Sequence, residues 1–160
     1  MVTLGEKSFI TLALFIGSWA VPFARAAEPP SDLCSLLSAA EVSKTLGPTY
    51  DSPTKRVAPR PFANTNEGTD CHYSAKGGTT LWFRAYVDPS PSEAKELFAK
   101  LKMFYSPPTP VAGLGDEAYF DPQHAIHVRK GKVRYYLALG KDPAAEQPLK
   151  DLATQVAGRL

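Results

Sequence analysis

The six residues GLGDEA, Gly113 to Ala118, match the pattern G-x-G-x-x-A. This pattern is one form of the fingerprint that holds the pyrophosphate of a dinucleotide at the N-terminus of a helix. The fingerprint needs a buried strand before the first glycine and a helix after the last position. Here the preceding SPPTPVA is rich in proline and the following YFDP favours a strand. We therefore predict no cofactor, and expect the glycines to form a sharp turn with a solvated acidic pair.

The three histidines, His72, His124 and His127, are the other candidates for chemistry. His124 and His127 have the spacing of metal ligands on a helix, but in a strand this separation puts them on opposite faces. Asp116 and Glu117 diverge in an extended chain and lack the further ligands of a calcium loop. We predict no metal site and, without a catalytic motif, no enzymatic activity. The alternative is a cell-envelope hydrolase or metal-dependent enzyme with a site assembled from dispersed residues.

Aromatic and cationic side chains in two predicted hairpins are the best candidates for binding. Alternate residues of a strand share a face, and seven of these are expected on the outer face of the sheet: Trp82, Arg84, Tyr86, His127, Arg129, Arg134 and Tyr136. Tryptophan, tyrosine and arginine are enriched in binding hot spots. Such a face suits an envelope glycan, an anionic small molecule or a partner protein. The alternative is a solvated surface of cross-strand pairs.

A sheet and three helices must position these side chains. Alternating patterns predict hairpins over residues 70–88 and 124–140, with further strands around 54–58 and 116–121. Capping residues and apolar periodicity predict helices over residues 39–47, 89–102 and 148–160. The order α-βββ-α-βββ-α indicates an α+β fold, an antiparallel sheet of about six strands with helices packed on one face. This order is compatible with a doubled unit.

The N-terminal residues 1–26 predict a signal peptide. Lys7 precedes an apolar run, and the small residues Ala24 and Ala26 form a cleavage site. An uncleaved anchor helix is the alternative. We expect one exported domain over residues 27–160, periplasmic or secreted, without a stable membrane span after cleavage.

The net charge bears on the class of partner, and the cysteines bear on the compartment. With 18 basic and 16 acidic residues, the net charge of +2 gives no case for a nucleic-acid partner. In an exported chain, the pair Cys34 and Cys71 predicts one disulfide. A redox-active or nucleophilic cysteine is the alternative.

Several segments in series resemble a family of small exported bacterial proteins of unknown function, many of them lipoproteins. They are CSLLSAAEVSKTLG, CHYS, VAGLGDEAYF, IHVRKGKVRYYLAL and the C-terminal LATQVAGRL. The likeness extends from Cys34 to Leu160. This chain departs from the lipoprotein members because no lipidated cysteine stands at its cleavage site. The resemblance implies that the paired cysteines are structural, and it brings no activity or catalytic residue.

Overall fold

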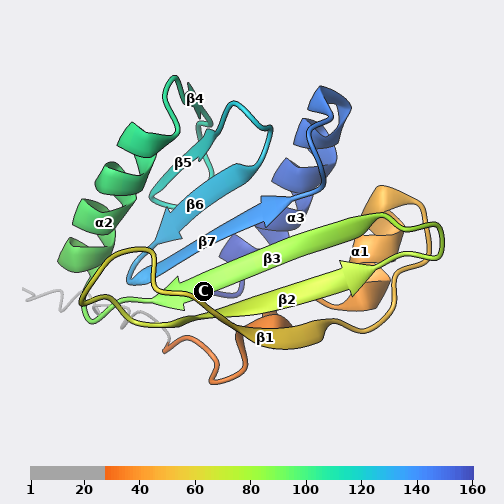
Figure 1. Cartoon of the computed structure of the whole chain (residues 1–160), viewed down its shortest axis with the longest axis horizontal. Helices are drawn as coiled ribbons and strands as arrows, with labels where there is room; N and C mark the ends of the chain where they lie inside the picture. The colour runs from red at the N-terminus through yellow and green to blue at the C-terminus, as the bar shows by residue number, and fades with distance from the viewer. Residues whose placement is uncertain (1–27) are drawn as a thin grey trace, which may run out of the picture.

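The computed structural model describes residues 28–160, so the predicted signal peptide lies outside the described residues. Seven strands form one antiparallel sheet in the order β1-β2-β3-β7-β6-β5-β4 (Figure 1). The α+β class is therefore confirmed. The predicted count of about six strands is one short because residues 109–110, within a proline-rich segment, pair with the edge of β5. The strands are β1 (Thr54–Ala58), β2 (Gly68–Ser74), β3 (Thr80–Val87), β4 (Thr109–Pro110), β5 (Glu117–Phe120), β6 (Ile126–Lys130) and β7 (Val133–Ala138).

The helices α1 and α2 begin at the capping residues that the sequence indicates. Ser38 and Glu41 form a reciprocal capping box at the start of α1 (Ala39–Leu46). Ser90 caps α2 (Pro91–Phe104), with proline in the first turn. A short 3₁₀ helix, η2 (Pro143–Ala145), leads directly into α3 (Glu146–Ala157), so this helix starts two residues before Pro148. Within residues 28–160, no helix is both long and apolar enough to span a membrane.

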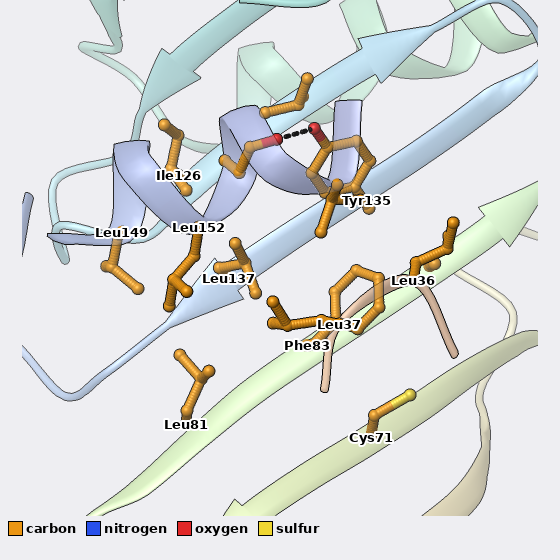
Figure 2. Packing of buried hydrophobic residues seen from close by; sticks show 14 of the residues in the cluster. Leu36, Leu37, Cys71, Leu81, Phe83, Ile126, Tyr135, Leu137, Leu149 and Leu152 are labelled. Atoms are coloured by element: carbon orange, nitrogen blue, oxygen red, sulfur yellow. Dashed lines mark hydrogen bonds between the residues drawn. The ribbon is translucent and has the colours of Figure 1, made fainter. Parts of the chain in front are cut away.

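The main core lies between the sheet and the pair α1 and α3, which lie behind the sheet in Figure 1. Leu81 and Phe83 of β3 and Leu137 of β7 point toward Leu149 and Leu152 of α3 (Figure 2). The hydroxyl of Tyr135 donates to the carbonyl of Ala153 at 2.7 Å, which satisfies a polar group inside this core.

The remaining helix, α2, packs on the opposite face of the sheet. Its Phe98 ring lies 5.2 Å from the ring of Tyr119, and its Lys102 pairs with Glu117 at 2.9 Å. Tyr119 and Glu117 alternate with the core residues Ala118 and Phe120, so they point away from α3. The prediction that all helices pack on one face is therefore wrong. The order with three strands in each half is also wrong, since four strands follow α2.

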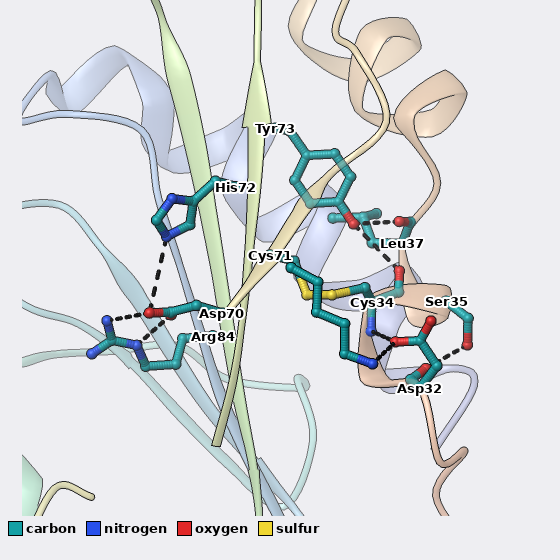
Figure 3. The surroundings of a disulfide bond; sticks show 10 residues. Asp32, Cys34, Ser35, Leu37, Asp70, Cys71, His72, Tyr73 and Arg84 are labelled. Carbon is teal, nitrogen blue, oxygen red and sulfur yellow. Dashed lines mark hydrogen bonds and ion pairs between the residues drawn. A yellow bond between two sulfur atoms is a disulfide. The ribbon is translucent and has the colours of Figure 1, made fainter. Parts of the chain in front are cut away.

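A disulfide between Cys34 and Cys71 confirms the predicted pairing. It ties the 3₁₀ helix η1 (Leu33–Leu36) to β2 across a sequence separation of 37 residues (Figure 3). The hydroxyl of the buried Tyr73 donates to the carbonyl of Leu37 at 2.5 Å, beside the disulfide. A loop of this length contributes roughly 4 kcal/mol in the chain-entropy model. Such a bond is typical of an oxidising compartment.

The GLGDEA segment forms a structural clamp. Gly113 and Gly115 have φ angles of +75° and +60°, which confirms the predicted sharp turn. The carboxylate of Asp116 accepts from the Arg129 guanidinium at 2.7 Å and from the Gly131 amide at 2.8 Å. Because Glu117 also pairs with Lys102, the expectation of a simply solvated acidic pair is wrong. The two carboxylates hold the start of β5 to the β6–β7 hairpin and to α2.

Candidate functional site

The seven predicted side chains do share one face of the sheet. Strand registers align six of them in two neighbouring rows, Arg84–Tyr136–His127 and Tyr86–Arg134–Arg129, across β3, β7 and β6. Trp82 stands in the next row, opposite Ala138 of β7. This arrangement follows from the alternation of side chains along the strands and from tight hairpin registers.

Most of this face is not an outer surface, and here the prediction is wrong. Tyr86, His127, Arg129 and Arg134 are all buried, and Arg134 is only 2% exposed. The physical reason is that α2 and the loop after β1 cover the rows. The ring of Tyr105, the C-cap residue that follows α2, lies 4.9 Å from the His127 ring. Trp82 escapes this cover and is 42% exposed.

Each of the three arginines in the predicted set has an acidic partner. The guanidinium of Arg84 makes two hydrogen bonds to Asp70, at 2.5 and 2.7 Å. Arg134 likewise donates to the buried Asp88 at 2.5 and 2.9 Å. Arg129 pairs with Asp116. The guanidiniums are therefore compensated, and they form no ladder of free positive charge that would attract an anion.

His127 completes the set of pairs through its Nε2 atom, which lies 3.0 Å from the Oδ2 atom of Asp121. Burial alone would raise the pKa of Asp121. Hydrogen bonds from His127 and from the backbone amides of Ala125 and Gln123 outweigh the burial and lower that pKa. Asp121 is therefore held as the carboxylate, and it orients the His127 ring from the end of β5.

A pocket of about 430 Å³ lies over these rows, between α2 and residues 59–62. Four of the predicted residues line it: Arg84, Tyr86, His127 and Tyr136. The hydroxyl of Tyr86 donates to the carbonyl of Pro59 at 3.0 Å, which fixes one wall. Prediction from the sequence missed the other lining residues, which come from the loop and from the end of α2: Pro59, Arg60, Pro61, Phe62, Leu101, Phe104 and Tyr105. For residues 59–62 the available signal was a concentration of proline and aromatic residues in a segment that breaks regular structure. Leu101 and Phe104 belong to the helix α2, and nothing local indicated that they line a pocket.

Aromatic rings surround His127, which lines the pocket. The His127 ring stacks between Tyr119, at 4.8 Å, and Tyr136, at 5.4 Å. Burial raises the pKa of Tyr136 to about 12 and also raises the pKa of Tyr119. Both phenols therefore stay neutral at physiological pH. At the mouth, the Arg60 guanidinium lies 3.8 Å from the carboxylate of Glu67, so this cation also has a partner.

The three histidines do not come together. His124 pairs with Glu146 at 2.7 Å, His127 pairs with Asp121, and His72 stacks on the Trp82 ring at 4.6 Å. Across residues 28–160, no group of three or more histidine, cysteine, aspartate or glutamate side chains is placed to hold a metal ion.

The pocket combines apolar rings with a small number of oriented polar groups, the arrangement typical of small-molecule sites. Comparison with known proteins adds no ligand to this geometry: no family model, curated protein or solved structure matches the chain.

Proposed function

We propose that this protein is an exported, non-enzymatic binding module that takes a neutral, ring-bearing group into the pocket between α2 and residues 59–62. The observation that carries the proposal is the aromatic and proline lining of this pocket of about 430 Å³. Pockets of this size and composition bury apolar parts of a ligand, and a few polar groups fix its orientation.

The charges around the pocket favour a neutral ligand. Arg84 is held by Asp70, and this hydrogen bond is the main cause that raises the pKa of the guanidinium. Tyr86 and Tyr136 are neutral phenols because burial raises their pKa. A charged ligand group would lose its hydration without meeting an uncompensated partner. A ring with few charges loses less hydration free energy on binding, and it gains contact with the tyrosine and phenylalanine side chains.

The disulfide supports a place for this module in the periplasm or outside the cell. The resemblance to small exported bacterial proteins points the same way, and a ligand from the cell envelope fits that location.

The proposal is tested with neutral ring fragments, indole and phenol, and with the anionic ring benzoate as the charged comparison. NMR spectra of the backbone amides would locate binding. We expect the neutral fragments to shift the amides of residues 60–62 and 101–105 more than benzoate does. Shifts confined to other segments, or stronger binding of benzoate, would contradict the proposal.

A matched pair of variants on α2 makes the test specific. Phe104 lines the pocket and Met103 does not, although the two side chains are 75% and 80% exposed. Because both are exposed, neither substitution should unfold the protein. We expect Phe104→Ala to weaken fragment binding about five- to tenfold, and Met103→Ala to leave it unchanged. Equal effects of the two variants would count against this pocket.

A further inference from the structure

The sheet face beyond the pocket carries an aromatic platform. The rings of His72 on β2 and Trp82 on β3 are cross-strand neighbours, with centroids 4.6 Å apart and planes within 24° of parallel. This separation matches the spacing of neighbouring strands. The stacking direction therefore runs across the strands, and both rings stand upright on the sheet.

One face of the Trp82 indole is consequently turned away from His72 and toward β7. Its cross-strand neighbour there is Ala138, whose single methyl group fills little of the space beside the indole. The 42% exposure of Trp82 agrees with an open indole face. In Figure 1 no helix lies in front of the middle of β2 and β3.

This platform is continuous with the pocket. Along β3, Trp82 is followed on the same face by Arg84 and Tyr86, and both of these line the pocket. The Cα atoms of Trp82 and Tyr86 are about 13 Å apart at the rise of an extended strand. Between them lies the hydrogen-bonded pair of Arg84 and Asp70, beside the ring of Tyr136 (Figure 3 shows the pair).

We propose that the ligand of this site is a neutral oligosaccharide that runs along β3, with one sugar ring against the free face of Trp82 and another in the pocket. The inference rests on the proposed function and deepens it by naming the class of ligand. The separation of platform and pocket requires several linked rings, so a single sugar occupies only part of the site.

The chemistry of the surface favours a saccharide over other chain-like ligands. A sugar ring has an apolar C–H face that packs on an aromatic ring, and hydroxyl groups that both donate and accept hydrogen bonds. The Arg84 side chain is 20% exposed, so its guanidinium can donate to a sugar hydroxyl while its pairing with the buried Asp70 leaves the pair without net charge. A peptide in extended form would need a sheet edge for its backbone, and this surface is the face of the sheet. Nucleic acid and anionic polymers need rows of uncompensated cations, whereas Arg84, Arg129 and Arg134 on this face are each paired with a carboxylate.

Trp82 itself reports on binding. The sequence has two tryptophans, and Trp19 lies within the predicted signal peptide, so Trp82 is the single tryptophan of the exported domain over residues 27–160. In the uncleaved chain, Trp19→Phe gives the same single reporter. The probes are chitotetraose, cellotetraose and maltotetraose, with N-acetylglucosamine and glucose as single-ring comparisons and a heparin-derived tetrasaccharide as the charged one. Calorimetry measures affinity, and tryptophan fluorescence locates the ligand. We expect one neutral tetrasaccharide to change the fluorescence and to bind at least tenfold more tightly than its monosaccharide.

The variant Trp82→Ala should lower that tetrasaccharide affinity about tenfold, to the level of the monosaccharide. Val57→Ser is the control, because Val57 is an exposed apolar residue of the edge strand β1 whose side chain lies on the opposite face of the sheet. The affinity of the Val57→Ser variant for the tetrasaccharide should equal that of the unchanged chain. Trp82→Phe should restore part of the loss, since it returns an aromatic ring.

Two results separate the failures. If the ring fragments occupy the pocket but no neutral tetrasaccharide binds, or Trp82→Ala leaves its affinity unchanged, the oligosaccharide inference is overturned and the pocket function stands. If neither fragments nor oligosaccharides bind, both proposals are overturned. Tighter binding of the heparin-derived tetrasaccharide than of every neutral one also overturns the inference.

Discussion

Gly113 and Gly115 offer a direct test of the clamp in the GLGDEA segment. Both glycines have positive φ angles, but their surroundings differ. A Cβ atom at Gly113 meets nothing within 4 Å. A Cβ atom at Gly115 would lie 2.6 Å from the carbonyl oxygen of Arg129 and 2.8 Å from a methyl carbon of Val128. Comparing Gly113→Ala with Gly115→Ala therefore separates the stability cost of an unfavourable backbone conformation from the stability cost of a steric clash.

The expected magnitudes follow from these two terms. Alanine in the left-handed region costs about 1–2 kcal/mol relative to glycine. Reduced freedom of the unfolded chain offsets roughly 0.4–1 kcal/mol of this cost. Gly113→Ala should therefore lower the free energy of unfolding by about 1 kcal/mol. Gly115→Ala carries the same cost and adds an overpacking term of about 1–3 kcal/mol.

The conflict at Gly115 is hard to relieve because its neighbour is fixed backbone. The Arg129 carbonyl accepts from the Asp116 amide at 2.8 Å, and Arg129 belongs to the paired strand β6. Moving this carbonyl would disturb the hydrogen bond and the Asp116 contacts to Arg129 and Gly131. We therefore expect the neighbouring strand to strain rather than adapt.

Urea unfolding of both variants measures the difference, which should be about 2 kcal/mol in the free energy of unfolding. In thermal unfolding, Gly115→Ala should have a Tm roughly 6–8 °C below that of Gly113→Ala. If Gly113→Ala proves as destabilising as Gly115→Ala, the close approach of Gly115 to β6 plays no part and the clamp argument fails.

Three further perturbations test the elements that hold the site. The double variant Cys34→Ser/Cys71→Ser should lose roughly 4 kcal/mol in urea unfolding, and a loss below about 1 kcal/mol would contradict the loop-closure argument. Arg134→Met leaves the buried Asp88 without its partner and should lower the free energy of unfolding by about 3–5 kcal/mol. Adding Asp88→Leu should recover most of this loss. If the double variant shows no recovery, an unpaired buried charge is not the cause. Hydrogen bonds from Arg159 and Ser38 lower the pKa of Glu41 from 4.5 to about 2, so its stabilising contribution is complete above pH 4.5 and is lost as the pH falls toward 2. Stability of Glu41→Gln, measured by urea unfolding across that range, should fall less steeply than that of the unchanged chain, and parallel curves would refute the effect.

The hairpins could be predicted because local rules decide them. Glycine-containing turns and strict alternation fix both the register and the face of each side chain. For the first hairpin, the turn at Lys76-Gly77-Gly78 places Asp70 opposite Arg84, as the β2–β3 register has it. The position of this turn was therefore enough to predict the ion pair between Asp70 and Arg84. The prediction of a cationic face did not take that pairing into account.

The position of α2 could not be obtained in the same way. Its apolar stripe, with Ala94 and Phe98 buried, predicts that the helix packs on something but not on which face of the sheet. The sheet face opposite the main core carries tyrosine, histidine and arginine. The alternation of apolar and polar residues along the strands therefore predicts that this face is exposed to solvent. These side chains have large apolar bodies, and they can be buried once their polar ends are paired. Tyr119 and His127 under α2 are the direct example.

The β6–β7 hairpin shows that buried arginines can require carboxylates from segments outside the hairpin itself. Its register sets Arg129 directly opposite Arg134, and like charges in this position are destabilising. Burial of both side chains makes the conflict more severe, so each needs its own carboxylate. Asp116, from the GLGDEA turn, serves Arg129, and Asp88, after the end of β3, serves Arg134. The acidic residue of the segment that resembled a nucleotide fingerprint is thus part of what allows two arginines to lie beneath α2 beside the pocket.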